Sequence, residues 1–251
     1  MTVATRSIPY SPLRLQFADS GPIMADIARL VETGDFTLGA ALADFERDLA
    51  AYTGVRYAVG VSNGTDALSL SLRALGIGHG DEVITAANSF IASAGAIAMV
   101  GATPVLVDVD DTLTISPDAI YEALTSRTRA VIPVHWTGTM ANMPAILELA
   151  REYDLDIIED AAQALGATLD GKHAGAWSAS AGLSFHPLKI LHVWGDGGAV
   201  LTRWSEFDAK LRLLRNHGLE TRDDAVIWGT NARLSTLQAV VASHGLKSLP
   251  Y

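Results

Sequence analysis

Short apolar runs alternate along the chain with longer stretches in which apolar residues recur every three or four positions. The short runs are rich in β-branched residues and predict buried strands, whereas the longer stretches predict amphipathic helices. We expect strands at Tyr57–Val61, Glu82–Thr85, Pro104–Val107, Ala130–Val134 and Asp156–Glu159, and further apolar segments at Ala181–Phe185 and Gly198–Thr202. We expect helices at Thr65–Leu75, Ser89–Val100, Pro117–Leu124, Met143–Tyr153, Ser205–Asn216 and Ala232–His244.

This alternation predicts an α/β fold, with a mostly parallel sheet in a three-layer α/β/α arrangement. Strands that are apolar along nearly their whole length must be covered by helices on both faces. In such sheets, ligands bind beyond the carboxyl ends of the strands. Residues that carry chemistry should therefore follow strands directly.

Composition narrows the class of partner. The 251 residues are 49% hydrophobic and carry a formal net charge of −10, which argues against a nucleic-acid surface because such surfaces need clustered basic residues. Cysteine is absent, so disulfides and thiolate chemistry are excluded. Met1–Ser20 lacks the pattern of a signal peptide, and the apolar stretch Ile91–Val105 is too short and interrupted to span a bilayer. We expect a cytoplasmic protein with no nucleic-acid or membrane partner.

A first candidate site is Ser62-Asn63-Gly64-Thr65, which follows a predicted strand and opens a predicted helix. Free backbone N–H groups and the helix dipole at such a position favour a phosphate. Glycine allows close approach of the backbone, and Thr65 can add a hydroxyl donor. The same residue types also form ordinary helix caps, so this segment alone does not establish a phosphate site.

A second candidate is Glu159-Asp160-Ala161-Ala162-Gln163, at the end of a predicted buried strand. A carboxylate there is costly unless it is paired, and a cationic ring nitrogen is a suitable partner. The alternative is that Asp160 is a helix N-cap.

A third candidate is Ser184-Phe185-His186-Pro187-Leu188-Lys189, between two apolar segments of a chain with only four lysines. A partly desolvated lysine is a better amine nucleophile toward an aldehyde, whereas the alternative is an ordinary surface lysine. A fourth segment, Asn231-Ala232-Arg233, opens the last predicted helix, where Asn231 also fits as a simple N-cap.

Taken in order, these segments resemble the DegT–StrS type sugar aminotransferases, which belong to the fold-type I superfamily of enzymes dependent on pyridoxal 5′-phosphate (PLP). The resemblance runs from about Gly34 to about Lys247. Further motifs that carry it are Gly34-Asp35-Phe36-Thr37-Leu38-Gly39, Asn88-Ser89-Phe90-Ile91-Ala92, Pro133-Val134-His135-Trp136-Thr137-Gly138 and Asn216-His217-Gly218. The expected fold is therefore the large domain of that superfamily.

The resemblance implies two catalytic residues. Lys189 would form the Schiff base with PLP and move protons, and Asp160 would pair with the pyridine nitrogen so that the ring can act as an electron sink. Gln163 would lie near one ring face and the phenolic oxygen. Phe90 would stack on the other face.

The resemblance also implies phosphate contacts from Gly64, Thr65 and Ser184. Asn231 would reach the phosphate of the neighbouring subunit's cofactor, which would make the active unit a homodimer with shared active sites. Candidates for supporting positions are His135, Trp136 and His186, although core packing explains Trp136 equally well.

The function implied is transfer of an amino group from glutamate or glutamine to a keto-sugar, expected to be nucleotide-linked, in polysaccharide, lipopolysaccharide or antibiotic sugar biosynthesis. The implied domains are an N-terminal segment 1–33, a PLP-binding large domain 34–247, and at 248–251 the start of a small C-terminal domain that relatives continue. No metal site is expected.

Three alternatives stay open. A PLP-dependent sugar dehydratase of the same fold would carry histidine in place of Lys189, so the lysine favours transamination. A catalytically impaired PLP-binding homologue is suggested by the short C-terminal part. A nicotinamide-dependent enzyme would need a G-x-G-x-x-G turn after the first strand, which Gly76-Ile77-Gly78-His79-Gly80 does not provide.

Overall fold

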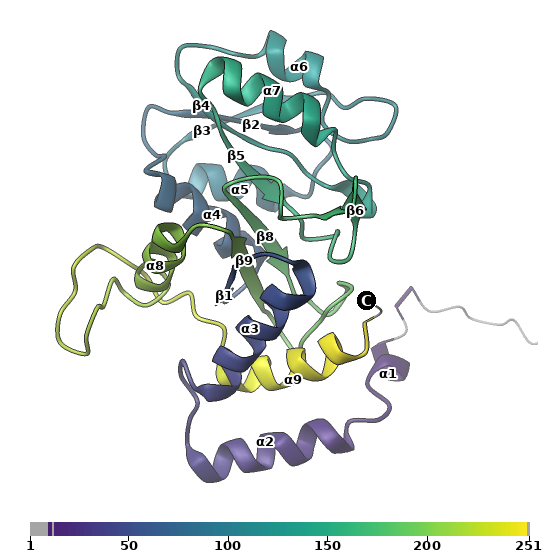
Figure 1. The fold of residues 1–251 in the computed structure, drawn as a ribbon, viewed down its shortest axis with the longest axis vertical. Helices are drawn as coiled ribbons and strands as arrows, with labels where there is room; N and C mark the ends of the chain where they lie inside the picture. The colour runs from purple at the N-terminus through teal and green to yellow at the C-terminus, as the bar shows by residue number, and fades with distance from the viewer. Residues whose placement is uncertain (1–9, 12, 250–251) are drawn as a thin grey trace, which may run out of the picture.

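A seven-stranded sheet forms the centre of the computed structural model, which describes residues 10–11 and 13–249 (Figure 1). The strand order is β1-β9-β8-β5-β4-β2-β3. The strands are β1 (Tyr57–Val61), β2 (Glu82–Ala86), β3 (Thr103–Val107), β4 (Thr128–Ile132), β5 (Asp156–Asp160), β8 (Ser180–Ser184) and β9 (Gly198–Thr202). The expected strands and apolar segments are all present, with shifts of a few residues at their ends.

Only β9 runs against the other strands of this sheet. The pairs β2–β3, β2–β4, β4–β5 and β5–β8 are parallel, whereas β9 is antiparallel to both β8 and β1. The connection between Ser184 and Gly198 contains no crossover helix, and antiparallel neighbours need none. The prediction of a mostly parallel sheet is confirmed.

Helices cover both faces of the sheet, which confirms the three-layer arrangement (Figure 1). One face carries α4 (Gly64–Leu75), α5 (Ile91–Met99) and α8 (Ser205–Leu214). The other carries α3 (Ala40–Thr53), α6 (Pro117–Glu122), α7 (Met143–Tyr153) and α9 (Thr236–Lys247). Neighbouring strand residues divide between the two cores: Ile157 packs on the α6–α7 side and Ile158 on the α4–α5 side.

The start of the last helix differs from the prediction. Residues 231–234 are not helical, and α9 begins at Thr236 with Ser235 as its N-cap. Asn231 instead forms an isolated bridge with Asn216, and Arg233 forms one with Val61. The expectation that Asn231 opens this helix is therefore wrong, because pairing with β1 and with the residues after α8 holds the segment extended.

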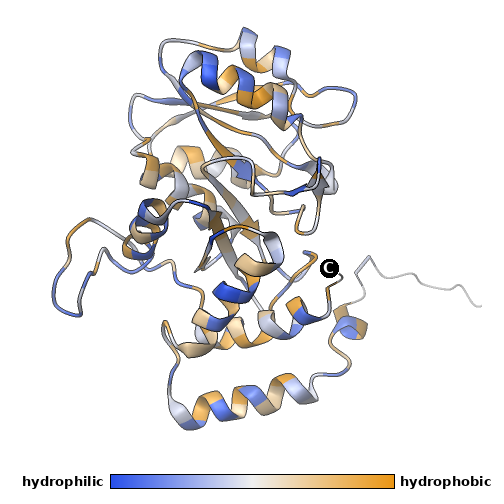
Figure 2. Cartoon of the chain, in the orientation of Figure 1, coloured by the Kyte–Doolittle hydropathy of each residue, from blue (hydrophilic) through white to orange (hydrophobic). Residues whose placement is uncertain are grey.

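Several elements before and between the expected ones were not predicted. They are α1 (Leu13–Gln16), α2 (Gly21–Thr33), α3 (Ala40–Thr53), the 3-10 turn η1 (Trp136–Gly138), and the short strands β6 (Thr168–Leu169) and β7 (Lys172–His173). Helix α2 packs on α9 at the periphery of the molecule and mixes hydrophobic with hydrophilic residues (Figures 1 and 2). The domain boundaries at 33 and 247 stay predictions. Part of the N-terminal segment, including part of Met1–Ser20, lies outside the described residues (1–9 and 12), as do residues 250–251 of the C-terminal segment.

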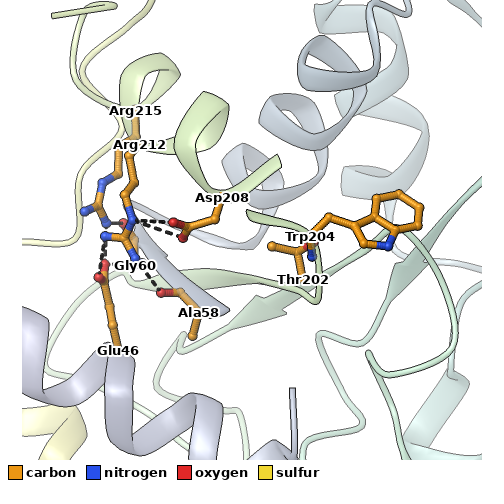
Figure 3. A network of polar contacts seen from close by, with 8 residues as sticks. All are labelled: Glu46, Ala58, Gly60, Thr202, Trp204, Asp208, Arg212 and Arg215. Atoms are coloured by element: carbon orange, nitrogen blue, oxygen red, sulfur yellow. Dashed lines mark hydrogen bonds and ion pairs between the residues drawn. The ribbon is translucent and has the colours of Figure 1, made fainter. Parts of the chain in front are cut away.

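A buried ion network joins α3, β1 and α8 (Figure 3). The carboxylate of Glu46 accepts hydrogen bonds from Arg215 Nη1 at 2.5 Å, from Arg212 Nη1 at 2.8 Å and from the backbone N–H of Gly60 at 2.8 Å. Arg215 Nη1 also donates to the Gly60 carbonyl at 2.7 Å. The network therefore fixes β1 one residue before that strand ends.

Candidate functional site

The segments singled out in the sequence meet at one edge of the sheet. Ser184 and Val61, the last residues of β8 and β1, are both paired with Gly198 at the start of the antiparallel β9. Asp160 ends β5, which pairs with β8. The turn after β1, the acidic end of β5 and the loop carrying Lys189 therefore lie at neighbouring positions of this edge.

The turn after β1 has the features of an anion site. Asn63 is the N-cap of α4, and its Oδ1 accepts from the Asp66 N–H at 2.8 Å. Helix geometry leaves the N–H groups of Gly64 and Thr65 without intrahelical partners. A Cβ atom on Gly64 would lie 2.8 Å from the Cβ of Ser184, so the turn and the end of β8 are in close contact. The free N–H groups at the start of α4 and the side chain of Ser184 are therefore close together.

Asp160 is held by donors from two directions. Its side chain is buried, with Oδ2 accepting from the Ser93 hydroxyl at 2.7 Å and Oδ1 accepting from the Ala162 N–H at 3.1 Å. No helix follows Asp160 directly, so the N-cap alternative is wrong. The carboxylate keeps lone pairs free for a further donor, such as a protonated ring nitrogen.

Lys189 lies in the loop between β8 and β9, where its N–H donates to the His186 carbonyl at 2.8 Å. Its side chain is half-buried. Burial lowers the pKa of the Lys189 amine below its ordinary value, while the carboxylate of Asp160 acts in the opposite direction. The two predicted catalytic groups are therefore close enough to interact electrostatically, and a larger share of the amine is unprotonated than in a free lysine.

Gln163 and Phe90 belong to segments that lie at the same edge of the sheet. Gln163 Oε1 accepts from the Thr137 N–H at 3.0 Å, which ties the segment after β5 to the turn after β4. Phe90 precedes α5, the helix that carries Ser93, and its ring is mostly exposed. An exposed aromatic ring beside this edge is available to stack on a planar ligand.

The side chain of Asn231 makes no hydrogen bond to the other predicted site residues within the described part of the chain. It is exposed, and its Oδ1 accepts from Arg233 Nε at 3.0 Å. The next residue is closer to the site, because the Ala232 carbonyl accepts from the Ser62 N–H at 3.0 Å. Asn231 is thus connected to the β1 turn only through the backbone.

Sequence reasoning missed Ser93, the donor to Asp160. The available signal was a pair of serines four residues apart, Ser89 and Ser93, in an otherwise apolar stretch; their hydroxyls lie 2.8 Å apart. Among the supporting candidates, His135 is fully buried and contacts Glu159, whereas His186 is exposed and accepts from the Leu188 N–H.

A groove of about 550 Å³ lies elsewhere, between α2, α3 and α9. Acidic and basic side chains line it together, among them Asp26, Asp44 and Arg47. None of the predicted site residues is part of this groove. Within the described part of the chain, no helix is both long and apolar enough to cross a membrane, and no cluster of three metal-binding side chains occurs.

A model of the DegT/DnrJ/EryC1/StrS aminotransferase family matches residues 19–251. The chain belongs to this family. Among curated DegT/DnrJ/EryC1/StrS relatives, the dTDP-3-amino-3,4,6-trideoxy-alpha-D-glucose transaminase of Streptomyces venezuelae is 45% identical over 94% of this chain. The match covers 63% of that relative, and 64% of each of the next two. The chain thus spans less than two thirds of the length of these relatives.

Solved structures of the family agree with the fold. The structure of S. venezuelae DesV in complex with a ketimine intermediate superimposes with a TM-score of 0.94 at 44% identity, covering 97% of this chain and 66% of DesV. The structure of NtdA from Bacillus subtilis, which contains the cofactor PMP, gives a TM-score of 0.91 at 34% identity. It covers 98% of this chain and 57% of NtdA.

The residues at the sheet edge fit a pyridoxal-type cofactor. The Gly64 turn leaves room that a Cβ would fill and offers backbone donors for a phosphate. Asp160 offers a buried carboxylate for a ring nitrogen, and Lys189 offers an amine with a lowered pKa. The described residues thus include one matching group each for the phosphate, the ring nitrogen and the carbonyl carbon of such a cofactor.

Proposed function

We propose that this chain forms the PLP-binding part of an aminotransferase that moves an amino group from glutamate or glutamine to a nucleotide-linked keto-sugar. The observation that carries the proposal is a half-buried Lys189 amine within electrostatic range of the buried carboxylate Asp160. The class of acceptor is supported by the similarity to the Streptomyces transaminase, whose name specifies a dTDP-linked amino sugar. Because that acceptor is a sugar, the proposed reaction would belong to sugar biosynthesis.

Each residue would act on a stated part of the cofactor. PLP, when bound, would supply an electron sink and carry the amino group between the two half-reactions. Lys189 would hold the cofactor covalently and then move a proton as general acid and base. Asp160 would keep a proton on the ring nitrogen, and its hydrogen bond from Ser93 would hold its carboxylate in place for that contact.

Binding would use the remaining residues. The N–H groups of Gly64 and Thr65, with the hydroxyl of Ser184, would bind the phosphate. Gln163, held by the Thr137 N–H, would lie near one ring face, and Phe90 would cover the other. These roles rest on the match of each residue to the family pattern and on the positions described above.

We also propose a homodimer that works in the cytoplasm. The exposure of Asn231, and its lack of side-chain contact with the β1 turn, are compatible with a role toward a second copy of the chain. Sedimentation analysis of the PLP-loaded protein would test this. A monomer that binds PLP with undiminished affinity after Asn231→Ala would contradict the shared site.

The test of the proposed function is chemical labelling of Lys189. The protein is incubated with PLP and reduced with borohydride, and peptides are analysed by mass spectrometry. We expect the cofactor on Lys189, no label in Lys189→Ala, and normal label in the control Lys247→Ala, which alters an exposed lysine on α9. Label elsewhere, or none, would refute the proposal.

A second measurement separates transamination from the alternatives. Glutamate added to the PLP-loaded protein should yield 2-oxoglutarate in proportion to the enzyme, and a keto-sugar should then be aminated. Loss of a sugar hydroxyl without 2-oxoglutarate would instead support a dehydratase. PLP binding without keto-acid release from any donor would support an impaired homologue.

A further inference from the structure

A fully buried carboxylate, Glu159, lies next to Asp160 on β5 and has no part in the proposed chemistry. Its Oε2 accepts from His135 Nε2 at 2.9 Å and from the Gly175 N–H at 2.7 Å. Its Oε1 accepts from the Trp177 N–H, the Ser178 N–H and the Ser178 hydroxyl at 2.8–3.1 Å. Burial alone would raise the pKa of Glu159, but these donors outweigh it and hold the pKa below its ordinary value. Glu159 is therefore a buried anion with five donors.

The hydrogen bonds of His135 define its tautomer. His135 Nδ1 accepts from the Ala141 N–H at 3.2 Å, so Nδ1 carries no proton. The proton must then be on Nε2, which donates it to Glu159. His135 thus bridges a backbone donor after β4 and the carboxylate on β5.

The backbone of His135 is paired with the backbone of Asp160. The His135 N–H donates to the Asp160 carbonyl at 3.0 Å, and the Asp160 N–H donates to the Pro133 carbonyl at 2.9 Å. Successive side chains of a strand point to opposite faces. Glu159 is therefore fixed on one face of the sheet, while Asp160 projects to the other face, where Ser93 is its donor.

The same histidine starts the turn that holds Gln163. The Gly138 N–H donates to the His135 carbonyl at 3.3 Å, and within this turn the N–H of Thr137 donates to Gln163 Oε1. Thr137 has a φ of +53°, a left-handed conformation that a β-branched residue adopts only when its surroundings hold it there. The His135 carbonyl and the Gln163 side chain are two of the groups that hold this turn.

We propose that His135 and Glu159 are positioning residues, which set Asp160 and Gln163 in place for the cofactor without touching it. This inference rests on the proposed PLP site and adds to it a requirement for the Nε2–H donor of His135. The pair connects β4, β5 and the 173–178 segment, so its loss changes the position of both predicted ring contacts at once.

Two substitutions of His135 separate its two hydrogen bonds. Glutamine at position 135 places its amide near Nε2 and keeps a donor for Glu159, whereas asparagine keeps only an acceptor for the Ala141 N–H. We expect His135→Asn to weaken PLP affinity by about tenfold or more, because it removes a hydrogen bond to a charged group. His135→Gln should remain within about threefold of wild type on the same scale. Glu159→Gln should resemble His135→Asn, since its NH₂ group would face one of the present donors.

Three readouts make this test independent of catalysis. They are the PLP dissociation constant by absorbance titration, the pH midpoint of the bound cofactor's visible band, and hydrogen–deuterium exchange at Thr137 in PLP-free protein. For His135→Asn we expect a midpoint shift of about half a pH unit or more, because Asp160 no longer holds the ring proton equally well. Exchange at Thr137 should accelerate.

The control is Ile120→Ala, which removes a fully buried side chain of α6 that is not part of this network. It should lower the melting temperature while leaving the PLP affinity and the midpoint unchanged. The inference is overturned if His135→Asn matches wild type in all three readouts, or if Ile120→Ala weakens PLP binding equally. Wild-type protein that binds no PLP would refute the proposed function itself, and the positioning role with it.

Discussion

The most demanding prediction concerns Glu46, whose single carboxylate satisfies donors from two other elements. Glu46→Gln keeps the size of the side chain but removes its charge and replaces one acceptor by a donor. The amide NH₂ would then face either Arg212 Nη1 or Arg215 Nη1, both of which are donors (Figure 3). Arg215 is buried and its Nε has no hydrogen-bond partner among the described residues, so it would lose the one salt bridge that it makes within this part of the chain.

The magnitude follows from burial. Removing one partner of a buried ion pair costs about 3–5 kcal/mol, because the remaining charge is uncompensated. Arg212 adds little, since its side chain is 39% exposed and keeps Asp208 as a partner. We therefore expect Glu46→Gln to cost about 3 kcal/mol, at the lower end because one acceptor oxygen remains. For a domain of this size that is a fall in melting temperature of about 6–12 °C.

The assay is thermal unfolding followed by circular dichroism and calorimetry, on PLP-free protein at one ionic strength. Asp208→Asn is the matched control: it breaks an ion pair of the half-exposed Arg212 and should cost no more than about 1 kcal/mol. The double variant Glu46→Gln with Arg215→Met should recover part of the loss, because no buried charge is then left alone. A melting temperature for Glu46→Gln within about 2 °C of wild type, or equal to that of Asp208→Asn, would refute this reasoning.

Two further predictions concern the site. Burial lowers the pKa of Lys189 below its ordinary value of 10.5, while Asp160 opposes this shift. Between the pKa of Lys189 in the folded protein and its pKa in the unfolded chain, the folded protein binds fewer protons. The stability of the folded protein therefore rises with pH in that range. Lys189→Met should therefore stabilise the PLP-free protein at about pH 7, with a smaller gain at about pH 10; thermal melts that differ equally at both pH values would contradict this. Gly64→Ala places a Cβ 2.8 Å from that of Ser184 and should weaken PLP binding by about tenfold, whereas Gly95→Ala on α5 meets no atom within 4 Å and should leave binding unchanged. Equal affinities in a PLP titration would remove the argument for a tight phosphate turn.

Much of the site could be predicted because it follows the strands. Gly64, Asp160 and Ser184 lie at or just after the carboxyl ends of β1, β5 and β8, whose apolar pattern is clear; these three strands run in the same direction, so their carboxyl ends lie at one edge of the sheet. The order of motifs then indicated the family. Ser93 escaped prediction because its role depends on α5 packing over Asp160, 67 residues away in the chain.

The local pattern was misleading at Asn231. An asparagine before an apolar stretch is a good N-cap, yet the helix begins four residues after the expected Ala232. Backbone pairing of Asn231 with Asn216 and of Arg233 with Val61 holds the segment extended. Such partners are distant in sequence, so helix propensity could not reveal them.

By itself, the sequence determined the strands of the seven-stranded sheet, most of the helices and the placement of polar residues at strand ends, since these depend on hydrophobic periodicity and local capping. Only the tertiary structure decided which polar side chains satisfy one another: Ser93 with Asp160, His135 with Glu159, and Glu46 with Arg215. Each of these pairs joins different elements, and a buried polar group must find its partner wherever the fold places one. Their identity therefore follows from packing and not from the local order of residues.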